Sequence, residues 1–369
     1  GRPRSHSEVQ NVVIVHWGNI GDFILFSPVL RAVRENFPHS RISCVVQTEN
    51  AELAKPCPYV DEWIFVRGHH TPNLGQGHGR EFGSRRLLLS TYIAILRSLR
   101  RNVDLLLGPE WLIFPSLQQV AENLLFTKGN SDELRLRLTA ADADGCFNNL
   151  QHQVPRTLGI IEVLGLAVSG DRTEIWLTED AKISLTNKLT HSLLNSTNPI
   201  VTVCLGAGQR KRDWTSTHLQ ELIHELRGAA PECQIAVTGP LSLRGATENL
   251  NPLDGNLHNL VGSLDLQELG WLIRRSAVVV SNDSAPAHMA AALGIPVVVV
   301  SAHPRSADPW HLNSPKRYRP WSKSSVVLQP ASPAPGCSDF CRAEEPHCVL
   351  NVSLDSVVQE TLTQLRLEP

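Results

Sequence analysis

The chain has 369 residues, of which 42% are hydrophobic and 19% charged, and its formal net charge is -2. This composition is typical of a globular protein with about two domains, and it excludes the strongly basic surface of a nucleic-acid-binding protein. The apolar runs are far shorter than the roughly 18 residues needed to span a membrane, and nothing resembles a signal peptide. We expect a cytoplasmic protein with no nucleic-acid partner and at most peripheral membrane association.

The chain opens with a predicted strand at residues 11–15, a glycine-containing turn, a helix that ends before Phe37, and a strand at 42–46. Apolar residues recur at helical spacing along this helix: Phe23, Phe26, Leu30 and Val33. Such a βαβ unit invites a dinucleotide-binding assignment. The turn lacks the Gly-x-Gly-x-x-Gly pattern, however, so nicotinamide binding is disfavoured.

Asp22 stands at the start of that helix, where a carboxylate has two possible roles. It can cap the helix, which is the commoner role, or it can act as a base. An anionic side chain there is a poor neighbour for a pyrophosphate. Both roles remain open from the sequence.

The middle of the first half is less informative. Residues 67–80 form a long loop rich in glycine, histidine and arginine, for which a mobile surface loop is favoured over a metal site. A predicted helix at 87–99 ends among arginines that complement the helix dipole or meet an anionic acceptor, and a strand follows at 103–107.

The second half repeats the α/β pattern after a boundary near residue 168. It begins with a helix at 180–194 and a strand at 200–205. The next helix has apolar residues at helical spacing and a candidate capping box: Leu219, Leu222, Ile223 and Leu226, with Thr217 and Gln220. A strand at 235–239 and a helix opening at Asp265 follow. Two similar halves in series predict a cleft between them.

Residues 278–300 indicate a buried strand, a polar turn, a short helix of small residues and a second buried strand. Unbroken β-branched runs are typical of parallel strands covered on both faces. The turn therefore lies at a carboxyl edge, where open α/β sheets bind ligands. Asp283 and Ser284 either cap the helix or leave its first N–H groups free to bind an anion such as a diphosphate.

Residues 206–214 form another small-residue turn after a strand, and they carry three successive cations, Arg210, Lys211 and Arg212. Close backbone approach combined with positive charge suits a phosphate-rich ligand. A solvated basic loop is the alternative. This alternative is less favoured, because this loop and Asp283 both follow strands of one predicted sheet.

Together these segments resemble the heptosyltransferase family of bacterial glycosyltransferases, whose members transfer heptose from a nucleotide diphosphate to a lipopolysaccharide core or to proteins. The resemblance spans most of the chain and rests on four segments in order. They are residues 21–38, 206–214, 283–296 and the closing stretch from Cys337 to Cys348 with the helix after it.

The resemblance implies an α/β fold with two Rossmann-like domains facing a cleft, the GT-B glycosyltransferase architecture. Residues 1–168 would form an N-terminal acceptor-binding domain and residues 169–350 a C-terminal nucleotide-sugar-binding domain. Residues 351–369 would form a helix that packs back on the first domain.

It also implies an inverting, metal-independent transfer of a heptose or related sugar, ADP-heptose being a familiar donor in lipopolysaccharide biosynthesis. The acceptor hydroxyl would belong to a glycan, a lipid-linked glycan, a protein or a small molecule, and catalysis would need no cofactor. Asp22 would be the general base, and Arg212 would bear the charge of the departing diphosphate. The donor-binding residues would be Gly206, Ala207, Gly208, Lys211, Leu264, Asp283, Ser284, Ala285 and His288, and the acceptor-binding residues Gly21 and Arg80.

The chain departs from well-known members at three places. Arg212 stands where they have a lysine, and Ala285 where they have a glycine. No carboxylate follows the strand that ends at Gly239, although those members use one there to bind the ribose. Arginine keeps the positive charge and adds a bidentate fork.

The closing stretch carries Cys337, Cys341 and Cys348, with His347 before the last cysteine. Protein-modifying heptosyltransferases carry a related cysteine finger. A structural site normally needs four ligands, so zinc or iron would require His347 or a distant residue as the fourth. A disulfide or free thiols are the alternatives.

Two other functional classes remain open. A nucleotide-sugar binding protein without catalytic activity could use the same fold, with Asp22 acting only as a cap. A sugar-nucleotide epimerase of similar architecture would change its donor with no acceptor present.

Overall fold

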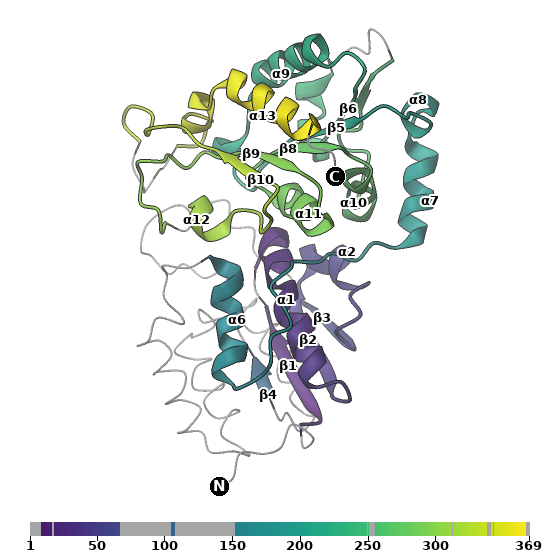
Figure 1. Cartoon of the computed structure of the whole chain (residues 1–369), viewed down its shortest axis with the longest axis vertical. Helices are drawn as coiled ribbons and strands as arrows, with labels where there is room; N and C mark the ends of the chain where they lie inside the picture. Colours follow the sequence, from purple (N-terminus) through teal and green to yellow (C-terminus); the bar gives the residue numbers. More distant parts are fainter. Residues whose placement is uncertain are drawn as a thin grey trace. The chain divides into compact units, whose positions relative to one another are not determined.

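The computed structural model describes residues 9–16, 18–66, 105–107, 152–248, 250, 255–311, 313–337, 341 and 343–366. The described residues form two compact units, one ending at Trp176 and the other beginning at Leu177. Each unit is an α/β structure with its own parallel sheet (Figure 1). The predicted fold class is confirmed, and the junction lies a few residues after the predicted boundary at 168.

The first unit contains a sheet with the strand order β3-β2-β1-β4, in which all neighbours are parallel. Its strands are β1 (Asn11–Val15), β2 (Arg41–Gln47), β3 (Glu62–Val66) and β4 (Leu105–Leu107). Its helices are α1 (Ile20–Asn36), α2 (Ala51–Ala54) and α6 (Gln153–Val163). The predicted helix after the first strand is confirmed, including its end before Phe37.

Helix α1 tolerates a proline in its interior because a neighbouring hydroxyl replaces the missing donor. Pro28 has no N–H to offer the carbonyl of Ile24. The hydroxyl of Ser27 donates to that carbonyl at 2.7 Å and accepts a bond from the amide of Glu174, also at 2.7 Å. The Ser-Pro pair therefore satisfies the helix and ties it to the segment before the second unit.

The second unit contains a larger parallel sheet with the order β10-β9-β8-β5-β6-β7. Its strands are β5 (Ile200–Cys204), β6 (Gln234–Thr238), β7 (Leu257–Asn259), β8 (Val278–Asn282), β9 (Val297–Val300) and β10 (Ser325–Leu328). Its helices are α7 (Glu179–Lys188), α8 (His191–Leu194), α9 (Ser216–Ala229), α10 (Leu266–Arg274), α11 (Ala285–Leu293), α12 (Pro315–Tyr318) and α13 (Leu354–Arg366).

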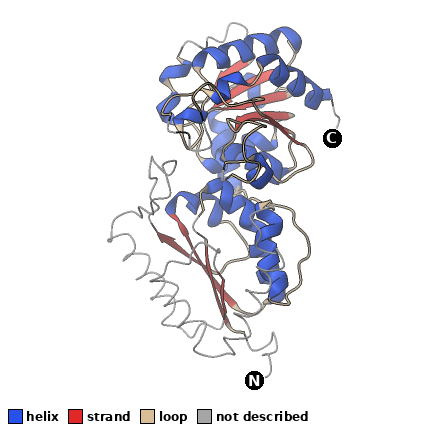
Figure 2. Cartoon of the chain, turned by 90° about the vertical axis from the view of Figure 1, so that its left-hand side faces the viewer, coloured by secondary structure: helices blue, strands red, loops and turns tan. Residues whose placement is uncertain are grey.

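Helices cover both faces of this sheet (Figure 2). One apolar layer joins the sheet to α9 and α13, and a second joins its opposite face to α7, α8 and α10. The strands β5, β8 and β9 are buried along their whole length, as expected for parallel strands that are covered on both faces. The apolar stripe predicted for α9 is confirmed, since its four leucine and isoleucine positions are buried.

The last helix corrects a prediction. Helix α13 was expected to pack on the first domain, but its residues Val357 and Val358 belong to the core of the second unit, where α13 contacts α9 and the strands β8, β9 and β10. Its buried valines meet the apolar face of the larger sheet. The resemblance implied the first domain as the partner of this helix, whereas its apolar side chains belong to the core of the second unit.

Two local predictions are also corrected. The helix expected at 180–194 is divided into α7 and α8, because Leu189 is extended and Thr190 caps the second piece by accepting from the amide of Leu193. Helix α9 is capped by Thr215, whose hydroxyl accepts from the amide of His218, rather than by Thr217. Asp265 caps α10 as predicted. Within the described residues, no helix is long and apolar enough to cross a membrane.

Candidate functional site

The topology of the second unit locates its candidate site. From β5 the chain moves to β6 on one side, and β8 lies on the other side of β5. The carboxyl ends of β5 and β8 therefore flank a topological switch point, where open α/β sheets bind ligands. The two segments predicted to bind a diphosphate are those that follow these two strands.

The loop after β5 is a closed turn. Gly206 has a φ of 91°, and a Cβ there would lie 3.0 Å from Cδ of Pro240, so this position favours glycine. The amide of Ala207 donates to the carboxylate of Asp213 at 2.5 Å, and residues Arg210–Arg212 form a single 3-10 turn. Burial raises the pKa of Asp213. The N–H of Ala207, one of the predicted donor-binding residues, is engaged within the loop.

Arg212 is held beside the second segment. Its carbonyl accepts from Nδ2 of Asn282 at 2.8 Å, and its guanidinium donates to Oδ1 of Asn313. Asp283 directly follows Asn282, and burial raises the pKa of its carboxyl while the charge of Arg212 opposes that shift. The structure thus brings Arg212 and Asp283 together from segments that are distant in the sequence.

The short helix α11 begins at this point. Ser284 is its N-cap residue in an extended conformation, but its side chain makes no capping hydrogen bond and instead contacts the carbonyl of Asn282 at 3.3 Å. A helix start with no side-chain cap leaves backbone N–H groups for an anion. His288 is buried one turn further along, and Gly294 ends the helix in the left-handed conformation, with φ of 77°.

Lys211 points elsewhere. Its ammonium donates to the carbonyl of Cys341 at 2.8 Å, and Arg210 forms an ion pair with Glu345 at 3.1 Å. Two of the three cations of the loop are therefore engaged with the closing cysteine segment. Of the three, Arg212 is the one whose charge acts on Asp283.

The turn that carries Asp22 lies at the carboxyl end of β1, the switch point of the smaller sheet. The carboxylate of Asp22 accepts from the amide of Asn19 at 2.9 Å, so the capping role is present. A Cβ on Gly18 would lie 2.3 Å from Cβ of Asp22 and 2.7 Å from Nε2 of His16. Glycine at position 18 therefore lets the imidazole and the carboxylate-bearing side chain approach the same point.

His16 is a feature of this turn that sequence reasoning missed. Its ring stacks on Phe26 with 4.7 Å between ring centroids, and its side chain is buried. Nε2 is buried without a hydrogen-bond partner among the described residues, and burial lowers the pKa of His16 to about 3. Gln47 and Asn50 donate to the carbonyl of Gly18 and hold the backbone of the turn.

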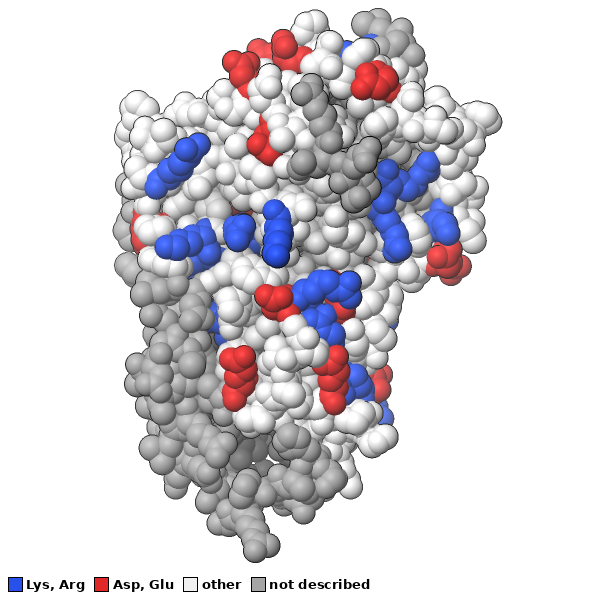
Figure 3. Space-filling model, viewed as in Figure 1, with Lys and Arg blue, Asp and Glu red and all other residues white. Residues whose placement is uncertain are grey.

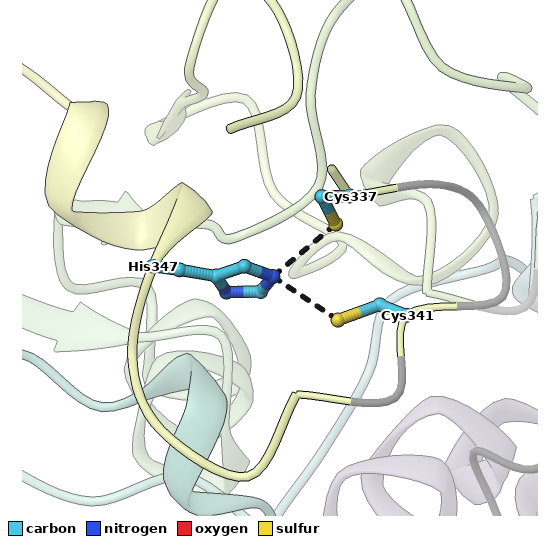
Figure 4. A group of neighbouring side chains, drawn as sticks. All are labelled: Cys337, Cys341 and His347. Carbon is cyan, nitrogen blue, oxygen red and sulfur yellow. Dashed lines mark hydrogen bonds between the residues drawn. The ribbon is translucent and has the colours of Figure 1, made fainter. Parts of the chain in front are cut away.

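The closing segment gathers three metal-ligand side chains (Figure 4). Nε2 of His347 lies 3.1 Å from Sγ of Cys341 and 3.2 Å from Sγ of Cys337, and the three ligand atoms lie within 4.8 Å of one another. Tetrahedral zinc separates a sulfur and a nitrogen ligand by roughly 3.5 Å. The set fits a soft metal, with His347 as a ligand and one coordination position to complete.

Cys348, the third predicted ligand, lies beside Cys337 but outside the group of three whose ligand atoms all lie within 4.8 Å of one another. It is buried, and its Sγ accepts from the amide of Ala334 at 3.3 Å. Burial, together with the neighbouring thiols of Cys348 and Cys341, raises the pKa of Cys337 to about 12. Burial and then the charge of Lys211 lower the pKa of His347, which favours the neutral ring that binds metals.

The remaining predicted residues are scattered. Gly21 lies in the first turn of α1, Gly208 is exposed, and Leu264 is partly buried against the layer of α7, α8 and α10. Arg80 and the 67–80 loop lie outside the described residues. Asn313, which binds Arg212, comes from a stretch without periodicity, so no signal in the sequence could have found it.

The described surface carries both signs of charge. On the face shown in Figure 3, Lys and Arg side chains are interspersed with Asp and Glu.

Both a family model and a protein of known function are similar to this chain in sequence. The family model of glycosyltransferase family 9 (heptosyltransferase) matches residues 147–345. Lipopolysaccharide heptosyltransferase 3 of Escherichia coli (strain K12) is 23% identical over 298 residues, which cover 75% of this chain and 78% of that protein.

Solved structures show the same fold. A family 9 glycosyl transferase from Veillonella parvula DSM 2008 has a TM-score of 0.69 at 15% identity and covers 96% of this chain and 97% of its own. E. coli heptosyltransferase WaaC with ADP has a TM-score of 0.62 at 18% identity and covers 96% of this chain and 100% of its own. Since the family model matches more than half of the chain, this protein belongs to glycosyltransferase family 9, the heptosyltransferase family, and is a glycosyltransferase.

Proposed function

We propose that this protein is an inverting glycosyltransferase that moves a heptose or related sugar from a nucleoside-diphosphate donor to an acceptor hydroxyl, without a metal in the chemical step. The observation that carries the proposal is the placement of Arg212 beside Asp283 at the switch point of the larger sheet. A cation and a helix start at one edge suit the diphosphate of such a donor.

In this proposal the donor diphosphate lies along the start of α11, where the amides of Asp283 to Ala285 and the side chain of His288 hold it. Arg212 bears the negative charge that develops as the sugar leaves, and preorganised charge of this kind is often the largest contribution to catalysis. Asn282 and Asn313 hold Arg212 in place. They are its positioning residues.

Asp22 is the proposed general base. It would accept the proton of the acceptor hydroxyl as that oxygen attacks the anomeric carbon, so that the new bond forms opposite the departing diphosphate. General-base assistance of this kind typically contributes about 10²–10⁴-fold in rate. The bond between Asn19 and Asp22 orients the carboxylate.

The relatives guide the choice of substrates. We propose ADP-heptose as the first donor to test and a lipopolysaccharide core glycan as the first acceptor, because one relative is named a lipopolysaccharide heptosyltransferase and a solved structure of the same fold is named an ADP-heptose lps heptosyltransferase. Proteins, other glycans and small molecules are the alternative acceptors for the same reaction. The turn after β6, Leu241–Leu243, offers no carboxylate to a ribose, so the base of the donor has to be measured.

We further propose a structural zinc or iron at the closing segment, held by Cys337, Cys341 and His347. The short distances among their ligand atoms support this set. Such a metal would fix the fold of the segment and would take no part in the transfer.

The first test is a calorimetric titration with ADP, GDP, UDP and TDP. We expect one diphosphate to bind selectively and Arg212→Ala to weaken its binding about 10- to 100-fold, since a hydrogen bond to a charged group contributes about 1.5–3 kcal/mol. Arg305→Ala, which changes an exposed arginine in the segment after β9, is the matched control and should bind as the parent does. Failure of all four diphosphates to bind would contradict the proposed donor site.

A further inference from the structure

The basic loop and the cysteine segment are physically connected. The ammonium of Lys211 donates to the carbonyl of Cys341 at 2.8 Å, and this carbonyl belongs to one of the candidate metal ligands. The ion pair of Arg210 with Glu345 joins the same two segments, although both side chains are largely exposed, at 74% and 66%, and contribute little. The lysine bond is therefore the principal link.

Arg212 is coupled to Lys211 through the backbone. The two residues belong to one 3-10 turn, Arg210–Arg212, inside a loop that the bond from Ala207 to Asp213 closes. On its other side, Arg212 is held by Asn282 at the end of β8. A displacement of Lys211 would shift the turn that presents Arg212 to the site beside Asp283.

The position of the Cys341 carbonyl depends in turn on how the closing segment is held. Its three candidate ligands span residues 337–347, and a metal that binds all three would fix them relative to one another. A metal supplies such order at the moment it binds, since a coordination site couples its binding energy to local folding. The thiols alone offer only weak hydrogen bonds to His347.

We propose that a soft metal at Cys337, Cys341 and His347 braces the loop after β5 through the bond between Lys211 and the carbonyl of Cys341, so that the metal and the donor diphosphate bind cooperatively. This inference rests on the proposed donor site and adds a regulation of that site. Lys211 is then a positioning residue for Arg212. Coupling between two binding sites is reciprocal, so the diphosphate strengthens metal binding by the same factor.

The experiment measures ADP affinity, with GDP, UDP and TDP in parallel, on the full chain under reducing conditions. One sample is freed of metal with a chelator, and the other is reconstituted with zinc, whose content is measured. We expect zinc to tighten binding of the preferred diphosphate about tenfold, a typical allosteric coupling. The diphosphate should tighten zinc binding by the same factor.

Two variants separate the link from the metal site. Lys211→Met keeps the aliphatic stem and removes the ammonium, so it should bind zinc as the parent does while its diphosphate affinity no longer responds to zinc. Cys337→Ser should lose zinc and keep the diphosphate affinity of the metal-free parent. Lys323→Met, which changes an exposed lysine, is the matched control and should retain the full response. Thermal stability with and without zinc checks that each variant folds.

The outcomes are distinct. If zinc raised the diphosphate affinity equally in the parent and in Lys211→Met, the proposed brace would be overturned. Equal diphosphate affinities of the metal-free and zinc-bound parent would also overturn it. Neither result would contradict the proposed donor site. A parent that binds no zinc would also overturn the brace. Absence of diphosphate binding in every form would overturn both the brace and the proposed function.

Discussion

Asp22→Asn is expected to lower kcat about 10²–10⁴-fold, the usual contribution of a general base. The amide cannot accept the proton of the acceptor hydroxyl, but its Oδ1 can still accept the bond from the amide of Asn19 that caps α1. Turnover should therefore fall while the midpoint of thermal unfolding changes little. The measurement is release of nucleoside diphosphate from ADP-heptose with a lipopolysaccharide core acceptor, beside calorimetric diphosphate affinity.

The matched control is Asp180→Asn, which changes an exposed carboxylate in the first turn of α7 and should leave kcat at the parent value. Full turnover in Asp22→Asn would show that Asp22 only caps the helix, as in a nucleotide-sugar binding protein. A donor that changes configuration with no acceptor present would instead indicate an epimerase. Unchanged diphosphate affinity together with lost turnover supports the transferase.

His16 is expected to make the protein lose stability as the pH falls below about 6.5. Burial lowers its pKa from 6.5 to about 3 in the folded state, so between these values the unfolded chain binds a proton that the folded chain does not. The free energy of unfolding then rises by about 1.4 kcal/mol per pH unit through this window and is constant above it. The contribution lost between pH 6.5 and pH 5 is about 2 kcal/mol.

His16→Phe tests this by denaturant unfolding at pH 7, 6 and 5. Phenylalanine keeps an aromatic ring against Phe26 and removes the buried Nε2, so the variant should be much less sensitive to acid than the parent. Burial also lowers the pKa of His258, which contributes to the parent's acid sensitivity and remains in the variant. His39→Gln, which changes an exposed histidine, should follow the parent curve. Parallel curves for the parent and His16→Phe would contradict the prediction.

Much of the fold could be read from local patterns. The buried β-branched runs of β8 and β9 predicted parallel strands, and the helical spacing of the apolar residues in α1 and α9 predicted which faces are buried. These signals depend only on residues that are close in the sequence, so they can be read without knowledge of the rest of the chain. The caps were less predictable, because threonines at 215 and 217 are both acceptable and the backbone selects one of them.

The candidate site was likewise predictable from the sequence only in part. The sequence placed Arg212 and Asp283 after strands of one predicted sheet, and the order of β5 and β8 made them neighbours. It grouped Lys211 with Arg212, but the structure directs Lys211 to the carbonyl of Cys341. It proposed Cys337, Cys341 and Cys348 as ligands with His347 or a distant residue as the fourth, and the structure groups His347 with Cys337 and Cys341. The side chains of adjacent residues in a tight turn point in different directions, and the spacing of the residues in the sequence does not show in which direction each one points.

By itself, the sequence determined the α/β class, the repetition of that pattern in two halves and the residue types suited to a diphosphate, since these follow from periodicity and side-chain chemistry. Only the tertiary structure decided that α13 covers the larger sheet of the second unit, that Asn313 holds Arg212, and that His16 lies buried beside the Asp22 turn. These depend on contacts between residues far apart in the chain, or on which side chains a turn buries, and no local pattern records either.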